Sequence, residues 1–292
     1  MTNHITALDE PFPSPDSLAA ATTSHTQNRF RISTRKLPIS KSAAIDALEA
    51  KLGIPVPEMI FGDNLVSITH VPTNWTLEFN TADALDAVDK TDKNMLRVAY
   101  ARDWESTREG TTQSIKEVVK PYDWSYSTTY RGTIRNADDD ELKSFRPTEK
   151  QIPIDLLKRR DPMLFFDEVV LYESELDDNG ISLCSAKLRV HEKRMLLLVR
   201  LFMRLDNVLV RLRDTRVYVD FETDEVLREY TAKESKLDDV KNALRRTGRL
   251  PDDVTIALRD PTALDPLLEV VEHRVEAVSL AASKAIIGKE RK

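Results

Sequence analysis

Residues able to do chemistry are few and scattered in this sequence of 292 residues. The five histidines stand at positions 4, 25, 70, 191 and 273, so none has the close spacing of a metal-binding pair, and neither HExxH nor CxxC occurs. The one cysteine, Cys184, lies in a β-prone run and is expected to be a small buried hydrophobic residue rather than a nucleophile. No metal or other cofactor is therefore expected.

Nucleotide and phosphoryl chemistry have no more support in the sequence. The seven glycines never come within three residues of one another, so there is no P-loop and no dinucleotide-binding fingerprint. The FGDN at residues 61–64 resembles one fragment of a phosphatase metal motif, but the accompanying GDxxDRG and GNHE segments are absent. A non-catalytic protein is expected, and a hydrolase that gathers distant carboxylates is the alternative.

Arginines form the most concentrated charge in the sequence. The β-prone runs 195–205 and 208–215 can pair as a hairpin, because the Asp-Asn pair between them tolerates the positive φ angles of a two-residue turn. In that register one face is an apolar layer that includes Leu212 and ends in Asp214. The opposite face carries four arginines: Arg200, Arg204, Arg211 and Arg213.

Four neighbouring cations repel one another unless carboxylates lie nearby. The candidates within the chain are Glu222, Glu229 and Glu234, and a partner is the other source. A basic sheet face within an acidic protein is therefore a candidate docking site. A solvated face that is neutralised within the chain is the alternative.

Three further side chains are candidates for partner contact, each with a structural alternative. Asp214 ends the apolar layer and must be paired or hydrogen-bonded, either within the chain by Arg216 or backbone groups, or by a partner. Asp83 is expected in the first turn of a helix, where the helix dipole favours a carboxylate. Ile152 is expected to be an apolar anchor within a loop.

The first half of the chain is predicted to mix helices and strands. In order, the pattern predicts a helix capped by Ser40 or Ser42 and ended by Gly53, a β-hairpin over 65–79, a helix capped by Asn80 or Thr81, and a strand over 95–99. The aromatic residues Tyr122, Trp124 and Tyr126 follow in a polar region, where an interface and the core are equally good locations. The acidic stretch 138–141 suits an exposed loop.

The second half is predicted to be mainly β. Six β-prone runs joined by short turns favour an antiparallel meander: 164–174, 181–190, 195–205, 208–215, 217–221 and 226–230. Helical spacing returns after Asp238 and predicts a last helix over 264–287. We therefore expect an α+β fold of antiparallel β-sheets, arranged as a sandwich or meander and flanked by helices. It would form a single domain over 28–288 with a helical tail, after a disordered arm over 1–27.

The composition excludes several classes of protein. Forty-three Lys and Arg against 49 Asp and Glu give a net charge of -6, which disfavours nucleic acid as a partner. The longest apolar run, 195–205, is interrupted by two arginines and is shorter than the roughly 20 residues of a membrane helix. The N-terminus lacks the pattern of a secretory signal, and one cysteine suits a reducing compartment. We expect a cytoplasmic, and also nuclear, protein with no membrane partner.

Longer blocks of sequence carry a family resemblance. RLDNVLVRLRDTRVY at 204–218 and VLREYTAKES at 226–235 closely resemble the signature of the TIPRL family of type 2A phosphatase activators and TOR signalling regulators. Four further blocks agree in the same order and extend the resemblance over roughly residues 40–235: PEMIFGDN, LEFNTADAL, EVVKPYDWSYSTTYRGT and FFDEVVLYESELDDNGIS. Several collinear blocks are stronger evidence than one short motif.

The resemblance implies an α+β protein that binds catalytic subunits of type 2A protein phosphatases. It also implies a cleft for the phosphatase's carboxyl-terminal tail, an extended peptide with acidic residues and a terminal carboxylate, and a Tap/alpha-four-type regulatory protein as a second candidate partner. Whether binding activates or inhibits stays open. We take the candidate partner-binding residues to be Asp83, Ile152, Arg200, Arg204, Arg211, Leu212, Arg213 and Asp214.

Overall fold

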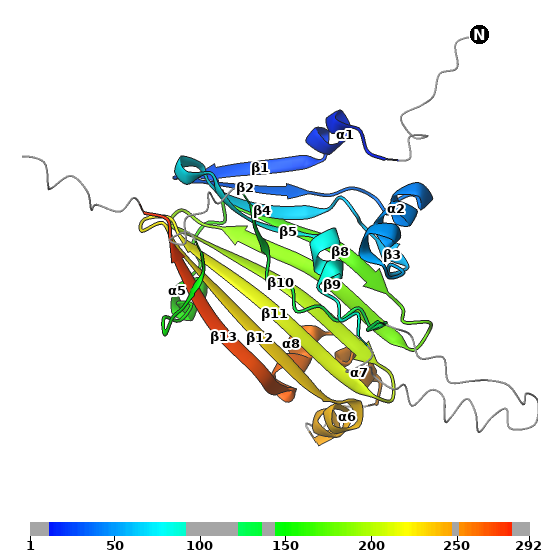
Figure 1. The fold of residues 1–292 in the computed structure, drawn as a ribbon. Helices are drawn as coiled ribbons and strands as arrows, with labels where there is room; N and C mark the ends of the chain where they lie inside the picture. The colour runs from blue at the N-terminus through cyan, green and yellow to red at the C-terminus, as the bar shows by residue number, and fades with distance from the viewer. Residues whose placement is uncertain (1–11, 92–121, 136–143, 247–250, 282–292) are drawn as a thin grey trace, which may run out of the picture.

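Two antiparallel β-sheets packed face to face, with short helices around them, make up the fold (Figure 1). The structure, a computed structural model, describes residues 12–91, 122–135, 144–246 and 251–281. The predicted α+β class, with antiparallel sheets flanked by helices, is confirmed. The strand predicted over 95–99 and the acidic stretch 138–141 lie outside the described residues.

The smaller sheet comes mostly from the first part of the chain. In spatial order its strands are β1 (Thr22–Gln27), β2 (Phe30–Arg35), β4 (Leu65–His70), β5 (Trp75–Asn80) and β6 (Thr133–Arg135). The β4–β5 pair confirms the hairpin predicted over 65–79.

The predicted disordered arm is wrong over residues 15–27. A short helix, α1 (Pro15–Ala20), is capped by the Ser14 side chain, and β1 pairs with β2 along its whole length. The polar sequence of β1 gives no apolar pattern from which a strand could be predicted. Backbone hydrogen bonds to β2, and not the burial of an apolar face, stabilise β1 as a strand.

The larger sheet contains the predicted meander. Its spatial order is β3 (Met59–Ile60), β8 (Phe165–Ser174), β9 (Gly180–Val190), β10 (Arg194–Leu205), β11 (Leu209–Asp220), β12 (Glu225–Lys236), β13 (Glu269–Ser279) and β7 (Arg146–Pro147). The runs predicted as two strands, 208–215 and 217–221, form the single strand β11.

The helix predicted over 264–287 is wrong where β13 stands. Valine-rich sequence suits a strand, and β12 pairs with β13 in antiparallel register. The paired positions run from Glu225 opposite Ser279 to Glu234 opposite Glu269. Apolar residues three and four positions apart do not by themselves distinguish a helix from such a strand.

Two predicted helix termini are confirmed, and one predicted helix start is wrong. The helices are α2 (Ser42–Leu52), α3 (Thr81–Asp86), α5 (Ile154–Leu157), α6 (Leu237–Arg246), α7 (Pro251–Ala257) and α8 (Pro261–Leu264), with 3-10 turns η1 (Val71–Thr73) and η3 (Asp265–Leu267). Asn80 caps α3, and Gly53 ends α2 with a left-handed φ of 72°, both as predicted. The predicted serine cap of α2 is wrong, because Lys41 is its N-cap and the Ser40 hydroxyl accepts from the Gly62 N–H instead.

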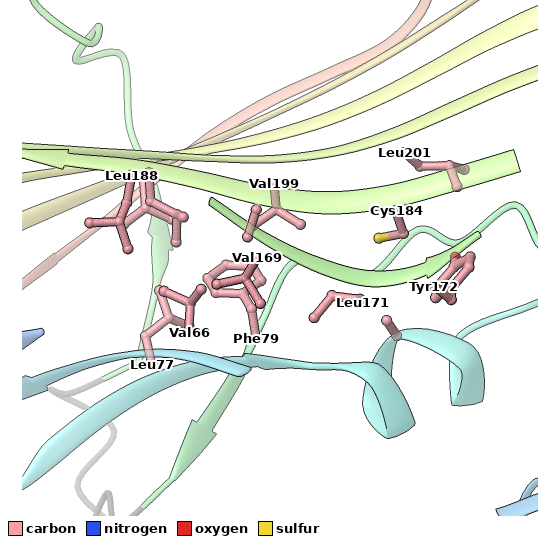
Figure 2. Close-up of a cluster of buried hydrophobic side chains, with 14 of the residues drawn as sticks. Val66, Leu77, Phe79, Val169, Leu171, Tyr172, Cys184, Leu188, Val199 and Leu201 are labelled. Atoms are coloured by element: carbon pink, nitrogen blue, oxygen red, sulfur yellow. The ribbon is translucent and has the colours of Figure 1, made fainter. Parts of the chain in front are cut away.

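The main core lies between the two sheets. Figure 2 shows Val66, Leu77 and Phe79 of the smaller sheet facing Val169 and Val199 of the larger one, and all five are buried. Apolar side chains at alternate positions of both sheets thus form one layer. We call the side of the larger sheet that meets this core its inner face, and the opposite side its outer face.

The core also contains the three aromatic residues for which the sequence left both an interface and a core location open. Tyr122, Trp124 and Tyr126 are buried among the core residues, which supports their structural interpretation. Cys184 is buried as predicted, and burial raises the pKa of its thiol to about 12. A thiol with such a pKa stays protonated and is a poor nucleophile.

Two smaller apolar clusters cover the outer face. One lies where α6, α7 and α8 pack against Phe202, Val210 and Leu212. The other forms where Ile152 packs against Tyr218 and Leu227, close to α5. Figure 1 shows α6–α8 near one end of β10–β13 and α5 near the other.

Candidate partner-binding surface

The β10–β11 hairpin decides where the arginines lie. Its turn contains three residues, Asp206, Asn207 and Val208, so Leu205 pairs with Leu209 rather than with Val208. Asn207 takes a left-handed φ of 62° within the turn. The extra residue shifts β11 by one position, and each of its side chains therefore lies on the face opposite to the predicted one.

The predicted face of four arginines is consequently wrong. Arg200 and Arg204 lie on the outer face, whereas Arg211 and Arg213 lie on the inner face, opposite Met203 and Leu201. Leu212 is opposite Phe202 in the outer cluster beneath α6–α8. The arginines are also mostly covered: the exposed fractions of their side chains are 16% for Arg200, 17% for Arg204, 11% for Arg211 and 15% for Arg213.

Asp214 is the centre of an ion network on the outer face. Its two carboxylate oxygens accept hydrogen bonds from Nε and Nη2 of Arg200, both at 2.7 Å, and from Nη2 of Arg216 at 2.9 Å. Burial alone would lower the pKa of Arg200, but the hydrogen bonds and charge of Asp214 raise it. The predicted pairing of Asp214 with Arg216 is confirmed, and Arg200 is a second partner.

The outer network continues across the sheet with alternating charges. Arg216 reaches Glu229 at 3.3 Å, and Glu229 lies 3.0 Å from the imidazole of His273 on β13. Arg204 lies outside this row. It binds Asp206 at 2.8 Å and the carbonyl of Leu258 at 3.2 Å, which ties the hairpin to the residue after α7. These contacts give the outer arginines structural partners within the chain.

The inner arginines share a carboxylate. Nε of Arg211 donates to Oε2 of Glu234 at 2.5 Å, and its Nη1 donates to Ser127 at 2.8 Å. Arg213 reaches the same Glu234 oxygen only at 3.4 Å, and burial followed by the positive charge of Arg211 lowers its pKa. Glu234 was one of the candidate counter-charges, and this expectation is confirmed. We call Arg211, Arg213 and Glu234 the inner arginine cluster.

The two remaining predicted residues lie elsewhere. Asp83 belongs to α3, beside the smaller sheet, and accepts hydrogen bonds from Thr133 and Arg135, both at 2.6 Å. Ile152 is a buried anchor on the outer face, as its sequence setting predicts. The eight predicted residues therefore fall in three places: α3, the outer face and the inner face.

Sequence reasoning missed two groups on the inner face. One is the contact of Arg211 with Ser127 and, at 3.7 Å, with Asp123, from a segment more than 80 residues earlier. Both lie in the block 117–133 that carries the family resemblance, which was the available signal. The other is Tyr230 of β12, which is buried beside the cluster and lies in the block 226–235 that also carries the family resemblance.

Two kinds of feature were not found among the described residues, a metal-binding cluster and a membrane-spanning helix. Within ranges 12–91, 122–135, 144–246 and 251–281, no group of three or more His, Cys, Asp or Glu is placed to hold a metal ion. Over the same part of the chain, no helix has the length and apolar character needed to cross a bilayer.

Residues 59–241, from β3 into α6, match the TIP41-like family. The chain belongs to the TIP41-like family. The resemblance found from the sequence blocks is thereby confirmed. The match leaves out β1, β2, α7, α8 and β13, which complete the two sheets and the outer cluster of this family member.

Relatives of this family cover most of the chain. The TIP41-like protein of Homo sapiens is 43% identical over 209 residues, 71% of this chain and 75% of the human protein. The type 2A phosphatase activator TIP41 of Saccharomyces cerevisiae is 37% identical over 268 residues, 86% of this chain and 73% of its own. The type 2A phosphatase activator tip41 of Schizosaccharomyces pombe is 33% identical over 246 residues, which are 84% of this chain and 94% of the S. pombe protein.

Proposed function

We propose that this protein is a non-catalytic regulator of type 2A protein Ser/Thr phosphatases that binds their catalytic subunit. One observation carries the proposal: a relative 37% identical across 86% of this chain is named a type 2A phosphatase activator. The regulator would act by occupancy, so that binding changes the activity of the phosphatase or its choice of other subunits. A role in TOR signalling, in the cytoplasm and nucleus, belongs to the same proposal, with a Tap/alpha-four-type protein as a further partner.

The inner arginine cluster supports a specific mode of binding. An acidic carboxyl-terminal tail would compete with Glu234 for Arg213, whose own contacts are long. The outer arginines are poorer candidates, because Asp214 already satisfies Arg200 with two hydrogen bonds of 2.7 Å. Arg213, rather than all four arginines, is therefore the residue on which tail docking would depend most.

Binding to purified phosphatase subunits tests this function. Immobilised full-length protein should retain a type 2A catalytic subunit, and removal of the subunit's carboxyl-terminal tail should weaken retention by about ten-fold or more if charged hydrogen bonds to the tail are lost. Failure to bind any type 2A catalytic subunit would contradict the proposal. Turnover of a phosphorylated substrate by the protein alone would contradict the non-catalytic assignment.

A further inference from the structure

Tyr230 presents a buried hydroxyl on the inner face. The residue is 3% exposed, and within the described ranges its Oη has no hydrogen-bond partner. Burial, the largest effect, raises the pKa of the phenol, so it is a hydroxyl donor at neutral pH. Native proteins rarely leave such a donor unused, because water has been removed from it without a replacement acceptor.

Three arginines lie near Tyr230 on the inner face. Tyr230 pairs with Thr215 of β11 and Arg274 of β13, and Arg213 lies diagonally across from it on the same face. The guanidinium carbon of Arg131 is 5.9 Å from the centroid of the Tyr230 ring. Positive side chains from three separate segments are thus neighbours of a tyrosine whose hydroxyl is unpaired.

Most of these arginines already have a close carboxylate. Arg131 lies 3.1 Å from Glu276, and Arg274 lies 2.5 Å from Glu272. Arg213 differs, because the one carboxylate that pairs with it among the described residues is 3.4 Å away and lies closer to Arg211, at 2.5 Å. Its other contacts are to the carbonyls of Leu212 and Lys233, also at 3.4 Å.

Arg213 belongs to a small group of charges on the inner face. Arg211 and Arg213 share Glu234, and Arg211 also lies 3.7 Å from Asp123. The charges of this group balance, but both carboxylates are placed for Arg211, and Arg213 is left with one long contact. A bound anion would give the mostly buried Arg213 closer acceptors.

We propose that Arg213 and Tyr230 are the centre of a binding site for a phosphate group, of the kind a phosphorylated peptide side chain carries. The guanidinium of Arg213 supplies several N–H donors, and Tyr230 adds an O–H donor from the neighbouring strand. A phosphate monoester offers three acceptor oxygens and close to two negative charges, which matches this donor set better than a single carboxylate does.

The site deepens the proposed function, since it names a group that the inner face would recognise on a phosphatase or on an accompanying regulator. The identity of that partner rests on the proposed function, whereas the site itself does not. Inorganic phosphate therefore tests the site without any phosphatase present. If the protein binds phosphate but no phosphatase, the phosphate site is supported and the proposed function is contradicted. If it binds a phosphatase but no phosphate, the proposed function is supported and the phosphate site is contradicted.

Calorimetric titration of the full chain with inorganic phosphate is the central experiment, with sodium acetate and sodium chloride at equal ionic strength for comparison. We expect one phosphate to bind per chain, and acetate to bind more weakly. Arg213→Gln should weaken phosphate binding by about ten-fold, and Arg213→Lys should recover part of the loss because it keeps the charge. Arg189→Gln is the matched control, since Arg189 is an exposed arginine on β9, and it should bind phosphate like the wild type.

Tyr230→Phe keeps the ring and removes only the hydroxyl. It should weaken phosphate binding several-fold while the Tm stays the same or rises, because an unsatisfied buried donor has been removed. A marked fall in Tm would mean that the hydroxyl has a structural partner and would overturn the proposal. Equal responses to phosphate and acetate, or wild-type phosphate affinity in Arg213→Gln, would overturn it as well.

Discussion

Arginines and carboxylates occur on both faces of the β10–β11 hairpin, but their contacts differ between the two faces. On the outer face, Asp214 holds Arg200 and Arg216 with hydrogen bonds of 2.7–2.9 Å, and Glu229 provides Arg216 with a second carboxylate. On the inner face, Arg213 lies 3.4 Å from a carboxylate that Arg211 already holds. Short contacts to carboxylates make the outer network part of the scaffold, whereas the long contacts of Arg213 leave this inner arginine able to bind an anion.

The largest effect is expected at the centre of the outer network. Replacing Asp214 with Ala leaves the mostly buried Arg200 without its carboxylate, so the free energy of unfolding should fall by about 3–5 kcal/mol. Urea unfolding measures the change. The control is Glu222→Ala, which removes an exposed carboxylate paired with Lys193 and should change stability little. Equal effects at both positions would show that the outer network is not structural.

A smaller loss is expected for the better-paired inner arginine. Arg211→Gln removes the bonds to Glu234 and Ser127, and charged hydrogen bonds of this kind contribute about 2 kcal/mol. The same urea experiment should place this variant between Asp214→Ala and wild type. Stability equal to wild type would mean that the two inner arginines are equivalent.

Arg213 should separate binding from stability most clearly. Arg213→Gln should change the free energy of unfolding by less than about 1 kcal/mol, because the removed contacts are long. The same change should weaken binding to a type 2A catalytic subunit by about ten-fold. If affinity is unchanged, the docking role of the inner cluster is wrong; if the Tm collapses, Arg213 belongs with the outer, structural arginines.

A pH-dependent effect is expected at Asp83, beside the smaller sheet. Burial alone would raise the pKa of Asp83, but hydrogen bonds from Thr133 and Asn80 and the charge of Arg135 lower it. A lowered folded-state pKa gives stability that is present above the unfolded pKa of about 3.9 and is lost as pH falls through the folded pKa.

Asp83→Asn should therefore cost about 1 kcal/mol at neutral pH, and the difference from wild type should shrink below about pH 4. Thermal unfolding from pH 7 to pH 3 measures both. A difference that stays constant with pH would show that the charge of Asp83 does not contribute.

Local sequence determined much of the fold. Alternating apolar runs located β4, β5 and β8–β12, because one buried face imposes a period of two. Asn80 and Gly53 marked helix ends through their side-chain cap and left-handed backbone. Several collinear blocks also identified the family, since a long ordered match does not depend on where any side chain points.

Only the tertiary structure decided that two segments are strands and which side chains meet at the candidate site. β1 and β13 are strands because β2 and β12 supply backbone partners, which their own sequences do not reveal. One extra residue in the turn before Leu209 reversed the face of every side chain on β11 and divided the four arginines. The partners that make Arg211 structural, Ser127 and Asp123, and the hydroxyl of Tyr230 beside Arg213 come from distant or neighbouring strands and segments, so only the folded chain brings them together.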